Sequence, residues 1–393
     1  QVSSDTKKKI AVWQPFFLGG GAEAVALWIL EALKDNYEVT LHTIYPVDFS
    51  WLNKMYGTSL SETSIKVHAE LPRKLARSLD FLMSNNEILR MALVYLTIKN
   101  LKNTSRKYDV LFSAFNAVDM GQQGVQYLHW THVVESPYEK AKFWQKVLMD
   151  WVQLSPERIR QNVSVSNSKY TSEAVSKKYG IQSKIVFPPV VAEMKSLPWE
   201  QKEDLFICSG RLVFAKQPHR VINILKSVRE KGFNVKLHIT GAGGGGERKY
   251  QKKIYSLAEK NSEWIYIHEN LPYCDYLDLV SRCRYGLHYK PEPFGISIAE
   301  MVKSGVIPFV RKRGGQIEIV GEENGELLFD DHEEAVDKIV NVLSNPALQQ
   351  KISKSLEQRK YLFGEKHFTE SIQSLVEEYL ASSSHQNSIK ENL

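Results

Sequence analysis

The chain alternates short runs of β-branched and aromatic residues with longer segments of helical character over almost its whole length. This alternation predicts a parallel α/β architecture, because each helix returns the chain to the start of the next strand. We expect two doubly wound sheets of about six strands each. The predicted strands are Lys9–Trp13, Glu38–Thr43, Ser64–His68, Asp109–Ser113, Val125–His129, Asn162–Ser166, Leu205–Ser209, Val235–Thr240, Trp264–His268, Tyr285–Tyr289, Ile307–Val310 and Glu326–Phe329.

The 393 residues are enough for two domains of ordinary size. Between the two sets of strands lies Phe187-Pro188-Pro189, which cannot continue a helix and places a hinge near residues 188–203. A ligand of such a protein is expected at the carboxyl ends of the strands. The predicted parts are a first domain over 1–190, a second over 191–363, a helix over 364–383 that can return to the first domain, and a disordered tail over 384–393.

Composition favours a soluble globular protein, with 43% hydrophobic and 24% charged residues. No apolar run approaches the roughly 18 residues of a membrane span. Lys7–Lys9 followed by apolar residues resembles a secretion signal, but Gln14, Pro15 and three glycines interrupt it, so we expect a first strand. The three cysteines form no disulfide framework or metal-ligand spacing, which favours the cytoplasm.

The net charge of +6 is concentrated in the first half of the chain. Residues 60–107 alone carry nine Lys or Arg against four Asp or Glu. Residues 71–83 and 88–98 within this region predict amphipathic helices with basic flanks. One interpretation is peripheral contact with anionic lipid on the cytoplasmic face of a membrane, or with an acidic acceptor. The other is two ordinary helices with a solvated basic face. Nucleic acid is disfavoured because no binding motif accompanies the charge.

Two carboxylates lie around the start of one predicted helix. Glu292 precedes the helix and Glu300 lies within it, eight residues on, before the helix ends near Gly305. Eight residues span about 12 Å at helical rise, and less across a loop. That separation suits hydroxyl groups on both sides of a diphosphate, as in a nucleotide sugar. The alternative is a solvated helix with two surface glutamates.

The residues between these glutamates predict an anion site. Amides of a first helical turn have no intrahelical partner, and the helix dipole favours negative charge there. A diphosphate is the usual ligand of such a turn. The amides concerned are those of Phe294, Gly295 and Ile296.

A glycine-rich loop follows the first strand. Gly19, Gly20 and Gly21 allow the backbone to turn tightly and to approach a ligand without a Cβ clash. We expect contact with phosphate or sugar here; the alternative is a flexible surface turn.

Two cations follow the first strand of the second domain. Gly210 ends that strand, and Arg211 and Lys216 lie on the loop that enters the next helix. Arg supplies bidentate donors and Lys a point charge, a pair that suits a diphosphate. The alternative is a pair of surface charges. His129, at the end of the fifth strand, is the candidate side chain of the first domain, although a single histidine in such a place is more often structural.

Gly241–Gly246 satisfies the dinucleotide-binding pattern G-x-G-x-x-G between a strand and a helix, and Glu269 ends the next strand. These features support an NAD(P)-dependent oxidoreductase as an alternative. Against it, the pattern does not open its domain, and it leaves Arg211, Lys216, Glu292 and Glu300 without a role.

Taken in order, these segments resemble the family 4 retaining glycosyltransferases, or group 1 glycosyltransferases, of GT-B fold, over nearly the whole chain. Gln126–His129 and Phe187–Pro189 are most similar to the subgroup that includes lipid-linked mannosyltransferases. The segments that carry the resemblance are Gly20–Glu23, Tyr127–His129, Val165–Ser168, Phe187–Val190, Ser209–Leu212 with Lys216, Glu292–Gly295 with Glu300, Gly314–Gly315 and Glu318–Val320.

The resemblance implies two Rossmann-like domains facing each other across a cleft, the first for the acceptor and the second for a nucleotide sugar. Arg211 and Lys216 would neutralise the leaving diphosphate. Glu292 would hold the hydroxyls of the donor sugar, and Glu300 those of the ribose.

Three residues of the first domain complete the site that the resemblance implies. The amides of Gly20 and Gly21 would contact sugar and phosphate, and His129 would line the reacting face of the sugar.

The implied reaction transfers a hexosyl unit from a UDP- or GDP-linked sugar to a glycan, a lipid-linked molecule or another small acceptor, with retention and without cofactor or metal. Attack occurs on the face that the diphosphate leaves, so Glu292 would bind the sugar rather than act as the nucleophile of a retaining hydrolase. An epimerase of the same architecture and a sugar-binding module without activity are further alternatives. The sugar, the base and the acceptor stay open.

Overall fold

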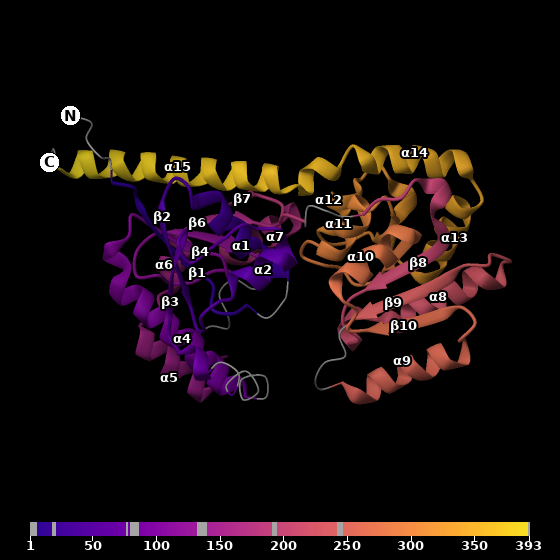
Figure 1. The fold of residues 1–393 in the computed structure, drawn as a ribbon, viewed down its shortest axis with the longest axis horizontal. Helices are drawn as coiled ribbons and strands as arrows, with labels where there is room; N and C mark the ends of the chain where they lie inside the picture. Colours follow the sequence, from indigo (N-terminus) through magenta and orange to yellow (C-terminus); the bar gives the residue numbers. More distant parts are fainter. Residues whose placement is uncertain are drawn as a thin grey trace. The chain divides into compact units, whose positions relative to one another are not determined.

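The computed structural model describes residues 6–17, 21–75, 78, 86–131, 140–190, 195–241 and 247–391. The chain forms two compact units, one of Gln1–Pro189 with Glu365–Leu393 and one of Val190–Gly364. Each unit contains a single parallel sheet with helices on both faces (Figure 1). Two doubly wound α/β domains, as the sequence predicts, are confirmed.

The sheet of the first unit has seven strands in the order β3-β2-β1-β4-β5-β6-β7. The strands run over β1 Lys9–Trp13, β2 Glu38–Thr43, β3 Ile65–Ala69, β4 Val110–Ser113, β5 Val125–Leu128, β6 Val163–Ser166 and β7 Ser183–Ile185. The helices of this unit are α1 Gly21–Leu33, α2 Phe49–Tyr56, α4 Glu87–Thr104, α5 Phe143–Val152, α6 Pro156–Gln161, α7 Lys169–Tyr179 and α15 Glu365–Glu391.

The sheet of the second unit has six strands in the order β10-β9-β8-β11-β12-β13. The strands are β8 Glu203–Ser209, β9 Lys236–Gly241, β10 Ile265–Glu269, β11 Cys283–His288, β12 Ile307–Arg311 and β13 Leu328–Phe329. The helices are α8 Pro218–Glu230, α9 Arg248–Lys260, α10 Tyr273–Arg282, α11 Ile296–Lys303, α12 Gln316–Val320, α13 His332–Leu343 and α14 Pro346–Glu357.

Every predicted strand corresponds to an observed one, with ends that differ by two residues at most. The strand missed by the prediction is β7, whose three residues are too few to show a period and are largely exposed. Of the two basic helices predicted in the first half, residues 88–98 lie within α4. Most of residues 71–83 lie outside the described residues, although 73–75 are helical.

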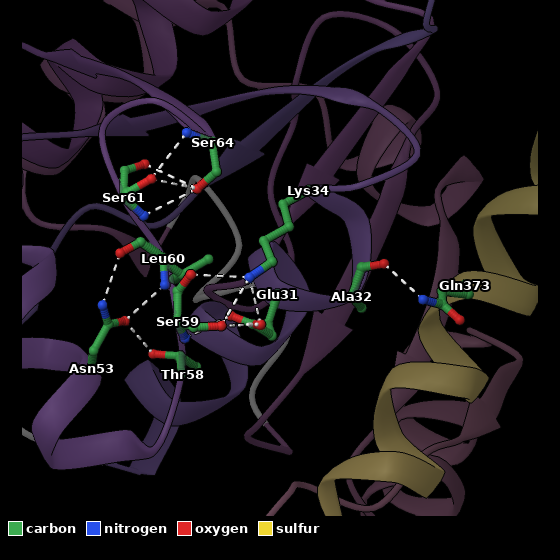
Figure 2. A network of polar contacts seen from close by, with 10 residues as sticks. All are labelled: Glu31, Ala32, Lys34, Asn53, Thr58, Ser59, Leu60, Ser61, Ser64 and Gln373. Atoms are coloured by element: carbon green, nitrogen blue, oxygen red, sulfur yellow. Dashed lines mark hydrogen bonds and ion pairs between the residues drawn. The ribbon is translucent and has the colours of Figure 1, made fainter.

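Helix α15 belongs to the first unit and packs along α1. Gln373 Nε2 donates to Ala32 O at 3.0 Å, as Figure 2 shows beside the network that joins Glu31 and Lys34 to Ser59. Residues 384–391, for which the sequence predicts disorder, continue this helix, because no Gly or Pro interrupts Glu365–Glu391. No helix within the described residues combines the length and the apolar character that a membrane span needs.

The strand order of each sheet creates a switch point beside its first strand. In the second unit, β8 lies between β9 and β11, so the loops after β8 and β11 leave the sheet in opposite directions. Ligands of doubly wound sheets bind outside the carboxyl ends at such points. In the core beneath this point, α11 packs close to β11. This packing requires glycine at position 286, because a Cβ there would lie only 2.4 Å from Met301 Sδ.

Candidate functional site

The loop after β8 brings two cations to the switch point of the second unit. Gly210 has φ +138°, a backbone conformation that residues other than glycine rarely adopt. The aliphatic stem of Lys216 covers this glycine, with Lys216 Cδ 3.6 Å from the position of a Cβ. Arg211 is exposed, and no ion pair between described residues engages it. Arg211 therefore retains donors for a ligand.

Glu292 lies opposite this loop, after β11, and only 8% of it is exposed. Its Oε1 accepts from Lys216 Nζ at 2.5 Å and lies 3.0 Å from His288 Nε2. Lys290 Nζ lies 3.9 Å from the other carboxylate oxygen. The predicted site residues Lys216 and Glu292 thus meet across 76 residues of sequence.

The surroundings of Glu292 keep it charged. Burial alone would raise the pKa of Glu292, but the hydrogen bond from His288 and the charge of Lys216 outweigh burial and lower the pKa to about 2. A permanently charged carboxylate accepts hydrogen bonds from hydroxyl groups and is a poor general acid. Glu292 is therefore suited to hold a polyhydroxylated ligand.

A second loop fixes the backbone that carries Glu292. The buried Gln316, at the start of α12, accepts from Glu292 N at 2.9 Å and donates to Lys290 O at 3.2 Å. Gly315 N donates to Glu292 O at 2.7 Å. A Cβ on Gly315 would lie 2.2 Å from Pro293 O, so this approach requires glycine. We call Gly314, Gly315 and Gln316 the clasp of Glu292.

Helix α11 starts beside Glu292. Its N-cap is Gly295, with φ +108°, and the N–H groups of Ile298 and Ala299 both reach Gly295 O. The first helical residue is Ile296, so the positive end of the helix dipole lies at this edge of the sheet. The Phe294 side chain is buried and packs against Phe363 at a centroid distance of 6.0 Å, so its ring is part of the core.

Glu300 lies within α11 and is partly buried. Burial raises its pKa to about 7, and the hydrogen bond from Tyr273 OH, 3.2 Å from Oε2, counters this shift only in part. Hydroxyl donors from a ligand would favour the charged form. Glu300 therefore changes its charge near neutral pH when the site is empty.

The edge that carries these residues is strongly cationic. A small pocket there is lined by residues from the ends of β8 and β11 and from the loops after them, among them Arg211, Lys216 and His288. The ends of β11 and β12 add four further cations, Lys290, Arg311, Lys312 and Arg313. The arrangement can bind a doubly charged anion and hold hydroxyl groups beside it.

Two of the predicted residues of the first unit, Gly21 and His129, are described, and each follows the carboxyl end of a strand. Gly20 lies outside the described residues, and Gly21 is the first residue of α1. His129 follows β5 and is buried, with Nε2 2.7 Å from Ala114 O. Burial lowers the pKa of His129 to about 4, although the hydrogen bond to Ala114 opposes the shift. His129 is therefore neutral at pH 7, with its Nε2 proton donated to the backbone.

Only the first glycine of the dinucleotide-binding pattern Gly241–Gly246 lies within the described residues. Residues 242–246 lie outside the described residues, and Gly241 is the last residue of β9. A Cβ on Gly241 would lie 2.2 Å from Gly210 O, so this glycine serves the approach of the Arg211 loop. The carboxylate of Glu269 accepts a hydrogen bond from Tyr255 OH.

His288 and Gln316 were not identified from the sequence. A histidine four residues before the predicted carboxylate was a weak available signal for the first. Gln316 follows Gly314-Gly315, which the resemblance includes, but its contact with Glu292 spans 24 residues and two loops. No local pattern indicates such a contact.

Residues 191–359 match the model of the family described as glycosyl transferases group 1. Among solved structures, HepE of Anabaena in complex with UDP and glucose has 17% sequence identity, a TM-score of 0.64, and coverage of 95% of this chain and 100% of that one. Sucrose-phosphate synthase of Thermosynechococcus elongatus has 15% identity, a TM-score of 0.65, and coverage of 96% and 100%. WaaG, a glycosyltransferase involved in lipopolysaccharide biosynthesis, has 14% identity, a TM-score of 0.63, and coverage of 93% and 99%.

No curated protein matches the chain in sequence. The likeness to these solved structures establishes the GT-B fold that the sequence resemblance implied. The family match covers the second unit, where the clasp, the Lys216–Glu292 pair and the start of α11 lie. Residues 191–359 are thus similar to the group 1 glycosyltransferases, and the solved structures extend the likeness of fold to nearly the whole chain.

Proposed function

We propose that the protein transfers a hexosyl unit from a UDP- or GDP-linked sugar, with retention of anomeric configuration, to a glycan, a lipid-linked molecule or another small acceptor. The observation that carries the proposal is the Lys216–Glu292–His288 cluster at the β8/β11 switch point, next to the start of α11. HepE was solved with UDP-glucose, which supports a UDP-linked donor. The first domain binds the acceptor in this proposal.

Charge stabilisation is assigned to the cationic edge. Breaking the bond between sugar and diphosphate places negative charge on a phosphate oxygen. In the proposal, Arg211, Lys216 and the amides of Phe294, Gly295 and Ile296 neutralise that charge, and fixed donors do so without reorganising. These groups perform the role that a metal ion has in other transferases, so the proposed reaction needs neither metal nor cofactor.

The two glutamates are assigned to hydroxyl groups. Glu292, held charged by its neighbours, binds the hydroxyls of the donor sugar, and Glu300 binds those of the ribose. Both are binding residues, because same-face attack lets the leaving phosphate take the proton of the acceptor. His129, Gly20 and Gly21 of the first domain approach the sugar and phosphate in the proposed complex.

Cytoplasmic location with peripheral membrane contact completes the proposal. The excess of basic residues in 60–107 supports it, since a lipid-linked acceptor would be presented at an anionic surface.

The experiment measures release of UDP or GDP from a panel of UDP- and GDP-sugars, with and without candidate acceptors. A transferase releases nucleotide only when acceptor is added and forms a product whose anomeric proton coupling matches that of the donor. An epimerase would release nucleotide without acceptor, and a sugar-binding module would release none. An oxidoreductase would instead bind nicotinamide dinucleotide and change its absorbance. An inverted product, or turnover abolished by EDTA, would contradict the proposed mechanism.

A further inference from the structure

Helix α5 exposes large apolar side chains along one face. Phe143 is 83% exposed, Val147 51% and Trp151 42%. Their spacing of four residues places them in one line along the helix. Of the ten residues of this helix, only Val152 is buried. Contiguous apolar side chains of this size on a surface indicate a contact with another body.

Three lysines lie beside this line of side chains, which we call the α5 stripe (Phe143, Val147 and Trp151). Lys142 precedes the helix, with Nζ 3.9 Å from a carboxylate oxygen of Glu87, and Lys146 lies one turn on, with Asp150 as the acidic residue of the helix. Lys99 of α4 places Nζ 5.2 Å from the centre of the Trp151 ring and 3.1 Å from Trp151 O. Long lysine side chains can cover an apolar body while their charge stays in the headgroup region.

The neighbouring helix extends the same surface. Helix α4 packs against α5, and the two lie side by side in Figure 1. Ile88, near the start of α4, is 52% exposed. Helix α4 also contributes Arg90 and Lys99 of the basic region 60–107, whereas Nζ of its Lys102 pairs with the buried Asp119 at 3.0 Å. Part of the positive charge of that region and the α5 stripe therefore lie on one pair of helices.

We propose that α5 lies in the headgroup region of an anionic bilayer, with the α5 stripe turned toward the acyl chains and the lysines toward lipid phosphates. A helix with apolar side chains on one face and cations beside them binds in the plane of such a surface. Tryptophan favours this interface because its ring is both apolar and a hydrogen-bond donor. This inference rests on the proposed function in that it gives the proposed enzyme a membrane partner. Its test measures vesicle binding and not turnover, so the membrane contact and the transferase activity can each fail separately.

The experiment is co-sedimentation of the full chain with vesicles of phosphatidylcholine, with or without about 30% phosphatidylglycerol. Binding is expected only to the anionic vesicles and should weaken with salt. Phe143→Ser combined with Trp151→Ser should raise the vesicle dissociation constant by about tenfold or more, because two apolar side chains lose their burial. Lys142→Gln and Lys146→Gln should each weaken binding about fivefold.

Two further variants locate the contact. Tyr361→Ser removes a 67% exposed aromatic side chain from the second unit and should leave binding unchanged. Trp151→Phe keeps an aromatic side chain in the α5 stripe but removes one of the eight tryptophans. It should bind vesicles as the wild type does, while quenching of fluorescence by brominated lipid falls.

The proposal is overturned if the wild type does not bind anionic vesicles, or if the double serine variant binds them equally well. It is also overturned if size-exclusion chromatography shows that the wild type is a dimer and the double serine variant a monomer, while vesicle binding persists. The α5 stripe would then be a self-association face. Circular dichroism of each variant checks that the fold is retained.

Discussion

Replacing Lys216 by Met tests whether the ion pair at the switch point both stabilises the second domain and binds the diphosphate. Methionine keeps an aliphatic stem over Gly210 and removes only the charge. A pKa of Glu292 lowered from 4.5 to about 2 corresponds to roughly 3 kcal/mol in favour of the charged form. His288 and Lys216 both contribute to this stabilisation of charged Glu292, so we expect the loss of Lys216 alone to lower the unfolding free energy by about 1–2 kcal/mol at pH 7.

The pH dependence of this loss follows from the direction of the shift. Glu292 stays charged in the folded protein down to about pH 2, whereas an unfolded glutamate takes up a proton near 4.5. Its stabilisation is therefore fully present above 4.5 and is lost as the pH falls toward 2. Lys216→Met moves the folded pKa of Glu292 back toward 4.5. The difference between variant and wild type should be constant above about pH 5 and shrink below it.

Urea unfolding at several pH values measures this difference, and isothermal titration with UDP and GDP measures binding. Loss of one charge-assisted bond to phosphate should weaken binding by about 10- to 100-fold. Lys226→Met, at an exposed position of α8, is the matched control and should change neither quantity. A double-mutant cycle with Glu292→Gln should show coupling of about 1 kcal/mol. Independent effects of the two substitutions, or unchanged nucleotide binding, would refute the reasoning.

Three further predictions concern the same edge of the sheet. Gly315→Ala should lower the unfolding free energy by about 2 kcal/mol or more, because its Cβ would press on Pro293 O; a thermal melt equal to that of the wild type would contradict the clasp. Gln316→Ala should weaken nucleotide-sugar binding about tenfold while UDP or GDP binding changes little, since the clasp orients the sugar-binding Glu292; equal losses for both ligands would argue against this role. Nucleotide affinity should fall as the pH drops below 7, by up to about tenfold per unit, because Glu300 must lose a proton to accept ribose hydroxyls; Glu300→Gln should lack this component in titrations at pH 6 and 8.

Much of the candidate site could be predicted from local patterns because its parts lie on loops that follow strands. Arg211 and Lys216 follow β8 closely, and Glu292 precedes α11 by four residues. In a parallel sheet such loops share one edge, so the strand pattern alone indicates that these residues can meet. The strand pattern does not explain the low pKa of Glu292. The structure does, because it places Glu292 between Lys216 and His288.

Other features of the site required the folded chain. Gln316 reaches Glu292 only because β12 lies next to β11, and no spacing in the sequence specifies which loop will close over which. For His129 the sequence indicates only its position after β5, whereas the folded chain adds its neutral state and its bond to the Ala114 carbonyl, and its place beside the sugar stays a prediction.

The sequence by itself determined the α/β class, the twelve strands with a strong apolar period and the loops that carry charge, because these depend on neighbours within a few residues. Only the tertiary structure decided how those charges pair, which carboxylate stays ionised and which apolar face, that of α5, stays uncovered. Ionisation and exposure depend on the groups that surround a side chain in space, and these come from segments far apart along the chain.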